Sequence, residues 1–183
     1  MSNDDDSKSA PSPWITRFSG LARGPLLDVA CGAGRHTRHF ADRGLPVTAV
    51  DRDISKLGAL RGHPDVTAIE ADLETEDTPW RPEPASYATV VVTNYLWRPL
   101  LPALVAALRP DGLLLYETFA EGNARYGKPS NPDFLLRPGE LLDAARERLT
   151  VIAYEHGEIG DPPRAVVQRI CATRDDGPKA LGV

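Results

Sequence analysis

Glycines and carboxylates follow short apolar runs in the first half of the chain. Gly32 and Gly34 come shortly after the run that ends at Val29, and Asp51 ends the next apolar run. Glycines at the end of a strand let the backbone approach a ligand closely, and an acid about 20 residues further on is placed to hold two ribose hydroxyls. This spacing predicts a site for a nucleoside cofactor.

The charge around these glycines indicates which nucleoside would bind. A dinucleotide brings a pyrophosphate, which binds to free N–H groups at a helix N-terminus. Here Asp28 precedes the glycines, and later acids fall where strands should end: Asp51, Glu70 and Asp72. These acids would repel phosphates but suit S-adenosylmethionine, whose sulfonium and ammonium groups are cationic. The third position of the pattern G-x-G-x-x-G is Thr37, which also disfavours an NAD-type oxidoreductase.

Taken together, these segments resemble the class I S-adenosylmethionine-dependent methyltransferases over roughly residues 14–173. The matching segments are the D-x-A-C-G-x-G turn from Asp28 to Gly34, Val50-Asp51, Ala71-Asp72-Leu73 and Thr93-Asn94-Tyr95. Ala30 departs from the superfamily, which usually has glycine there. Other segments are similar to small bacterial methyltransferases of the tellurite-resistance type: Leu27 to His36, Asn94-Tyr95-Leu96 with Arg98-Pro99-Leu100, and Tyr116 to Phe119.

The resemblance implies cofactor-binding roles. Asp51 would accept hydrogen bonds from both ribose hydroxyls, and the alternative is a turn acid at a helix N-terminus. Asp72 and Leu73 would flank the adenine, unless Asp72 is only a solvated loop acid. Asp28 would orient the turn or meet the methionine ammonium through water. The predicted cofactor-binding residues are Trp14, Asp28, Ala30, Cys31, Gly32, Gly34, Arg35, Asp51, Arg52, Asp72, Leu73 and Asn94.

Methyl transfer from a sulfonium is an in-line displacement that mainly requires alignment of the acceptor and exclusion of water, with no metal. Asn94 and Tyr95 follow the fourth predicted strand, where the superfamily places groups beside the methyl. Their alternative role is packing and strand-end hydrogen bonding. Arg98 would hold an anionic substrate or be a surface residue at a helix start. These three residues are the candidates for catalysis, and His36 and His39 lack the partners that a metal site needs.

The order of the predicted elements indicates an α/β fold. We predict a Rossmann-like, mostly parallel sheet of seven strands with an antiparallel last strand and helices on both faces. The expected strands are 26–29, 46–50, 66–70, 89–93, 113–118, 150–155 and 165–172. The expected helices are 35–43, 54–60 with Asp53 as N-cap, 99–108, and 139–149. Between Asp72 and Ala88, prolines predict a loop in place of a helix.

Two segments are predicted to cover the ligand. The run Phe119 to Pro138 follows the fifth strand, and a structureless loop of this length is usually functional. We expect a substrate lid that carries Arg125, Tyr126 and Phe134, with a flexible surface loop as the alternative. The segment from Trp14 to Phe18 would form a second cover, or it would pack on the core.

Size and composition place further bounds on function. A chain of 183 residues suits one domain, here 14–173, with a disordered tail at 1–13 and a loose tail at 174–183. The net charge of −5 argues against nucleic-acid binding. Two cysteines without framework spacing, no spanning segment and no signal peptide together predict a cytoplasmic protein without membrane association.

The leading hypothesis is therefore a methyltransferase that acts on a small molecule or a small oxyanion. The alternative is a protein that binds S-adenosylmethionine as a sensor, without turnover. The acceptor stays open among tellurite, thiols, halides, a hydroxylated metabolite or a protein side chain, because a fold does not determine a substrate. The sequence gives no indication of the oligomeric state.

Overall fold

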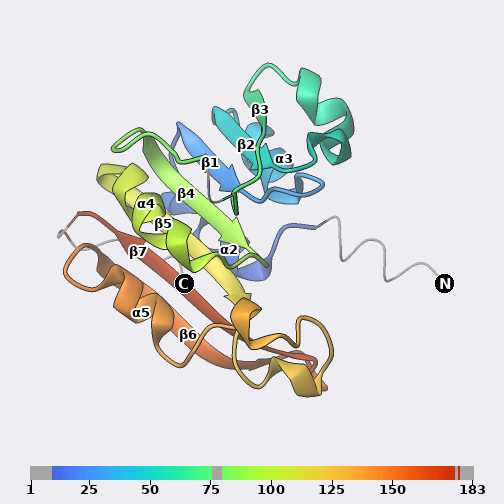
Figure 1. The fold of residues 1–183 in the computed structure, drawn as a ribbon. Helices are drawn as coiled ribbons and strands as arrows, with labels where there is room; N and C mark the ends of the chain where they lie inside the picture. The colour runs from blue at the N-terminus through green and yellow to red at the C-terminus, as the bar shows by residue number, and fades with distance from the viewer. Residues whose placement is uncertain (1–9, 76–79, 176, 178–183) are drawn as a thin grey trace.

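The structure, a computed structural model, describes residues 10–75, 80–175 and 177 (Figure 1). One sheet organises the chain, and its strands are β1 Leu26–Val29, β2 Val47–Asp51, β3 Val66–Glu70, β4 Tyr87–Thr93, β5 Leu108–Phe119, β6 Thr150–Ile159 and β7 Ala165–Thr173. The strand order is β3-β2-β1-β4-β5-β7-β6. The first five strands are parallel, whereas β7 runs antiparallel to both β5 and β6. The predicted fold class is confirmed.

Helices cover both faces of this sheet (Figure 1). Their bounds are α2 Pro13–Phe18, α3 Arg35–Ala41, α4 Leu101–Ala107 and α5 Glu140–Ala145, and the 3₁₀ turns are η1 Ser19–Leu21, η2 Ile54–Gly62, η3 Arg98–Leu100, η4 Asn123–Arg125 and η5 Pro132–Phe134. Because side chains alternate along a strand, Leu114 and Tyr116 pack with α4 and α5, while Leu113 and Leu115 pack with α2 and α3. None of the described helices is long and apolar enough to span a membrane.

All four predicted helices differ from the observed elements, and the first, α3, ends at Ala41 rather than at Arg43. The segment predicted to be a helix at 54–60 is the 3₁₀ turn η2, because Gly58 interrupts it at φ +54°, although Asp53 caps it as expected. The last helix ends at Ala145 rather than at Leu149, since Arg146 is extended and Glu147 has φ +60°. Helix α4 ends at Ala107, and β5 begins at Leu108.

The prediction that Phe119 to Pro138 is structureless is wrong. Ala120 pairs with Leu136 in an isolated parallel bridge, and both residues are buried. The buried amide of Asn123 donates to the carbonyl of Pro129 and accepts from the N–H of Val166. Through these bonds, backbone groups of the segment have hydrogen-bond partners without a long helix or a sheet. The segment is therefore ordered, although its only helical elements are the 3₁₀ turns η4 and η5.

The ends of the chain are ordered further than expected. Residues 1–9 lie outside the described residues, but Ser12 is buried and caps α2, and Trp14 is 2% exposed within the core. The Trp14 side chain therefore packs in the core, which was the alternative to a role in covering the ligand. At the other end, Arg174 donates to the carbonyls of Gly112 and Leu108.

Part of the predicted loop at 74–84, residues 76–79, lies outside the described residues, and 80–86 contain no helix.

Candidate active site

A left-handed turn after β1 forms the centre of the site. Ala30, Gly32 and Gly34 have φ of +52°, +55° and +75°. At Gly34, a Cβ would lie 2.6 Å from Leu57, so this position requires glycine for space as well as for conformation. Ala30 is the one residue of the three that carries a side chain in a backbone region that L-residues rarely adopt.

Two backbone N–H groups, one of them in this turn, fix the carboxylate of Asp51. Its Oδ2 accepts a 2.8 Å hydrogen bond from the N–H of Gly32, and its Oδ1 accepts a 3.0 Å bond from the N–H of Asp53. The end of β2 and the turn after β1 are thereby joined through one carboxylate. Each oxygen keeps further acceptor capacity for a ligand hydroxyl.

Of the two roles expected for Asp28, its hydrogen bond to Thr37 agrees with orientation of the turn. Asp28 is buried and does not line the pocket described below, and it accepts a 2.6 Å hydrogen bond from the hydroxyl of Thr37. Burial raises its pKa to about 6, against the opposing effect of the Thr37 bond. This contact explains why threonine stands where a dinucleotide site has its third glycine, because the hydroxyl connects α3 to β1.

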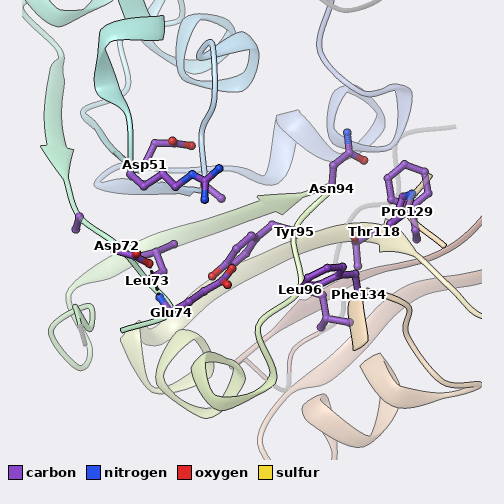
Figure 2. Close-up of a pocket in the computed structure, with 14 residues that line it drawn as sticks. Asp51, Asp72, Leu73, Glu74, Asn94, Tyr95, Leu96, Thr118, Pro129 and Phe134 are labelled. Atoms are coloured by element: carbon purple, nitrogen blue, oxygen red, sulfur yellow. Dashed lines mark hydrogen bonds between the residues drawn. The ribbon is translucent and has the colours of Figure 1, made fainter. Parts of the chain in front are cut away.

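A cavity of about 460 Å³ opens beside the turn, at the carboxyl ends of the parallel strands. Figure 2 shows that its labelled residues fall into two groups. The first group, called the acidic end, contains Asp51, Asp72, Leu73, Glu74 and Tyr95. The second group, called the apolar end, contains Asn94, Leu96, Thr118, Pro129 and Phe134. Ala30, Arg52, Ala71 and Phe119 complete the lining of the cavity.

Tyr95 belongs to the acidic end. Its side chain points toward Glu74 and Leu73 rather than toward Phe134 (Figure 2). Its carbonyl accepts a 2.8 Å hydrogen bond from the Tyr116 hydroxyl, and Asn94 before it turns the chain at φ +54°. Among the described residues, the buried Tyr95 hydroxyl has no hydrogen-bond partner. Burial, followed by the charge of Glu74, raises the pKa of Tyr95, so the hydroxyl stays a donor.

Arg98 does not line the cavity. Its guanidinium donates to both carboxylate oxygens of Glu140, at 2.7 and 3.0 Å, and to the carbonyls of Asp133 and Leu135, at 2.7 and 2.8 Å. The hydrogen bond to Glu140 raises the pKa of Arg98 further above its usual range. The role of anion holder expected for Arg98 is therefore not supported by its position.

The remaining predicted residues lie behind or beside the cavity. Gly32 contributes its N–H to Asp51, and Trp14, Cys31, Gly34 and Arg35 do not line the cavity. Of the expected lid residues, Phe134 lines the cavity, whereas Arg125 pairs with Glu158 and lies over the Tyr126 ring. Six lining residues were not among the site residues predicted from the sequence: Ala71, Glu74, Leu96, Thr118, Phe119 and Pro129. Proximity to Asp72, Tyr95 and the end of β5 would have indicated the first four, and the last two fall within the predicted lid.

His36 is a structural residue. Its Nε2 accepts from the N–H of Ser12 at 3.1 Å, which leaves the ring proton on Nδ1, 3.3 Å from the Thr93 hydroxyl. Burial, with the charge of Arg35, lowers the pKa of His36 to about 3, so the ring is neutral. In the described part of the chain, no group of three or more metal-binding side chains comes together.

Comparisons with known proteins agree with this geometry. A family model described as a methyltransferase domain matches residues 26–112, which run from β1 into β5. A methyltransferase structure from Mesorhizobium loti, described as S-adenosylmethionine dependent, superposes with a TM-score of 0.67 at 16% identity, covering 87% of this chain and 95% of that one. The structure of TehB from Haemophilus influenzae has a TM-score of 0.65 at 16% identity, covering 88% and 61%.

Residues 26–112 of the chain therefore match a methyltransferase domain, and the chain shares the fold of S-adenosylmethionine-dependent methyltransferase structures. The chain is 30% identical over 117 residues to a malonyl-[acyl-carrier protein] O-methyltransferase from Salmonella typhimurium, covering 60% of this chain and 44% of that protein. It is 28% identical over 112 residues to a ubiquinone biosynthesis O-methyltransferase from Azoarcus sp., covering 57% and 48%. The chain thus spans about half the length of the curated relatives that it matches.

The acidic end of the cavity fits the cofactor of this family. S-adenosylmethionine carries two cationic groups, a ribose with two free hydroxyls and an adenine. Asp51, Asp72 and Glu74 present carboxylates at this end, and the unpartnered Tyr95 hydroxyl adds a donor. A cavity of this volume lies within the usual range for small ligands, about 300–1,000 Å³. The cavity therefore has the donor and acceptor groups that S-adenosylmethionine requires.

Proposed function

We propose that this methyltransferase transfers a methyl group from S-adenosylmethionine to a small-molecule acceptor. The observation that carries the proposal is the position of Asp51, whose carboxylate is fixed by Gly32 and Asp53 at one end of a cavity that continues past Asn94. In open α/β sheets, ligands bind at the carboxyl ends of the strands, where the strand order reverses. Here that point lies between β1 and β4.

Bound S-adenosylmethionine supplies an electrophilic methyl carbon: an acceptor lone pair bonds to it, the methyl–sulfur bond breaks with its electrons on sulfur, and the acceptor's proton leaves to water. Asp51 would hold the ribose hydroxyls, and the two N–H groups that it accepts from would keep its orientation during the reaction. Asn94 directly follows β4, Thr118 lies near the end of the neighbouring strand β5, and both would hydrogen-bond the acceptor. Such alignment is the main contribution that a protein makes to this displacement.

The test is calorimetric titration with S-adenosylhomocysteine. Asp51→Asn should weaken binding at least tenfold, since a hydrogen bond to a charged group contributes about 1.5–3 kcal/mol and 1.4 kcal/mol is a factor of ten. Asp143→Ala is the matched control, because Asp143 is an exposed acid on α5 that pairs with Arg146. Equal affinity of wild type and Asp51→Asn would remove Asp51 from the ribose site.

Turnover separates an enzyme from a sensor. Wild-type protein, S-adenosylmethionine and a panel of small thiols, phenols and oxyanions are incubated, and S-adenosylhomocysteine is measured. Product formation with one acceptor class supports the proposal. Tight cofactor binding without product across the panel would instead support a sensor that binds S-adenosylmethionine.

We further propose that nucleic acid is not the acceptor and that the methyltransferase works in the cytoplasm. The net charge of −5 and the acids of the cavity support the first part, and two unpaired cysteines support the second. Filter binding to mixed RNA and duplex DNA at low salt should give little retention. Retention that falls roughly 10³-fold between 50 and 200 mM salt, as several phosphate contacts produce, would contradict the first part.

A further inference from the structure

The end of the cavity away from Asp51 is apolar and aromatic. Leu96, Pro129 and Phe134 supply most of its wall, and Asn94 and Thr118 are its polar members. Figure 2 shows Leu96 and Phe134 in one part of the lining and Asp72 and Glu74 in another. This end lies mostly beyond residue 112, where the match to the methyltransferase domain model stops. Its chemistry is therefore a property of this chain that the family match does not describe.

Phe134 is the most informative residue of this wall. Its side chain is 46% exposed, although the next two residues, Leu135 and Leu136, are buried at 3% and 0%. An exposed phenylalanine that lines a cavity leaves apolar area that a ligand can remove from water, at about 25 cal/mol per Å². Aromatic ligands gain further from ring contacts with such a side chain.

Arg98 holds Phe134 in this position. Two of its hydrogen bonds go to the carbonyls of Asp133 and Leu135, the residues on either side of Phe134, and its remaining bonds go to Glu140. The arginine that would have suited an anionic acceptor is thus neutralised by Glu140 and supports an aromatic wall. Burial opposes ionisation of Glu140, yet its bonds from Arg98 and Arg137 keep its pKa below the usual range.

The charge at the opposite end also disfavours an anion. Asp51, Asp72 and Glu74 line the same cavity, with Arg52 as the one basic residue among its described lining residues. An oxyanion such as tellurite would meet this acidic field, whereas a neutral acceptor would not. Thr118 and Asn94, the polar residues of the apolar end, can hydrogen-bond a single polar atom of the acceptor.

We propose that the acceptor is a small neutral aromatic molecule, which binds against Phe134 and Leu96 with its nucleophilic atom toward Thr118 and Asn94. This inference rests on the proposed function for the methyl transfer itself, but the binding of an aromatic molecule does not require turnover. An experiment can therefore contradict the inference of an aromatic site without contradicting the proposed methyl transfer, and the reverse.

The binding test uses N-phenyl-1-naphthylamine, a neutral aromatic dye whose fluorescence rises in an apolar site. Protein saturated with S-adenosylhomocysteine should bind the dye, and Phe134→Ala should weaken the dye affinity about fivefold, as expected from the loss of roughly half a phenylalanine of buried area. Leu142→Ala is the control, because Leu142 is exposed at 36% on α5 and does not line the cavity. Dye affinity unchanged by Phe134→Ala would overturn the inference.

The turnover test compares benzyl mercaptan, 2-mercaptoethanol and tellurite at equal concentration; the two thiols are both neutral at pH 7, and only the first is aromatic. We expect the largest kcat/KM for benzyl mercaptan and a raised benzyl mercaptan KM in Phe134→Ala, with S-adenosylhomocysteine affinity within twofold of wild type. A preference for tellurite would overturn the inference and leave the proposed function standing. Failure of S-adenosylhomocysteine to bind would overturn the proposed function, while the dye measurement, repeated without it, would still decide the aromatic site.

Discussion

The hydroxyl of Ser12 donates a 2.7 Å hydrogen bond to Oε1 of Glu117, a residue 105 positions further along the chain. The same hydroxyl accepts from the N–H of Trp14, and the N–H of Ser12 donates to His36. Hydrogen bonds of Ser12 therefore connect the start of α2 to both β5 and α3. One oxygen of the Glu117 carboxylate, near the end of β5, accepts one of these bonds. Glu117 also accepts from Arg169, so its charge serves the structure and is absent from the cavity lining.

Ser12→Ala should lower the free energy of unfolding by about 2 kcal/mol, since it removes an N-cap and a hydrogen bond to a buried carboxylate. Urea denaturation followed by tryptophan fluorescence measures the change. Ser19→Ala is the matched control, because its hydroxyl donates only to the carbonyl of Thr16 in an exposed bond. Similar losses in both variants would contradict the structural role of Ser12.

Asp28→Asn should change the dependence of stability on pH. Burial raises the Asp28 pKa from 3.8 to about 6, so the folded state binds the proton more tightly than the unfolded state. The corresponding stability is fully present below pH 3.8 and is lost as the pH rises through 6. This loss is on the order of 3 kcal/mol.

Because an asparagine amide oxygen can still accept from Thr37, Asp28→Asn should become progressively more stable than wild type between pH 4 and pH 7. Urea denaturation of both proteins across this range gives the difference directly. Stability curves that stay parallel would show that the Asp28 pKa is not raised in the folded state.

Ala30→Gly should cost little or no stability. Ala30 has φ +52°, and a non-glycine residue in this region is strained by roughly 1–2 kcal/mol, which offsets the extra entropy that glycine brings to the unfolded chain. Ala103→Gly within α4 is the control and should cost about 1 kcal/mol. Thermal and urea denaturation measure both, and equal losses would mean that the turn is not strained at Ala30.

Arg98→Ala should loosen the wall that carries Phe134. Hydrogen–deuterium exchange should become faster at residues 131–136, because two carbonyl bonds and the ion pair to Glu140 are lost. Affinity for S-adenosylhomocysteine should stay within twofold of wild type. Arg125→Ala removes an ion pair to Glu158 from the same segment, and it should leave exchange at 131–136 unchanged.

Neither cysteine should react in the folded protein. Burial raises the pKa of the Cys31 thiol and that of Cys171, the latter to about 12, so the thiolate that reacts is scarce at neutral pH. Ellman's reagent should label both cysteines only after addition of denaturant. Rapid labelling of one thiol in the native protein would contradict this.

Much of the acidic end could be anticipated from local sequence. Apolar runs predict buried strands, and acids or glycines that directly follow them must reach the carboxyl edge of a parallel sheet. Asp51, Asp72 and Leu73 lie in the cavity wall for this reason. Local sequence is less informative for Asp28. Its side chain is buried and accepts a hydrogen bond from the Thr37 side chain, which strand periodicity does not predict.

The apolar end of the cavity was decided by the tertiary structure. Phe134 and Pro129 reach the cavity because their segment folds back on β5 through the bridge between Ala120 and Leu136. Arg98 has a flexible side chain near the cavity, and only folding brings Glu140, 42 residues away, within 2.7 Å of it. Strand periodicity determines which residues arrive at an edge, whereas the partner of a long charged side chain depends on which distant group the packed chain places within hydrogen-bond reach.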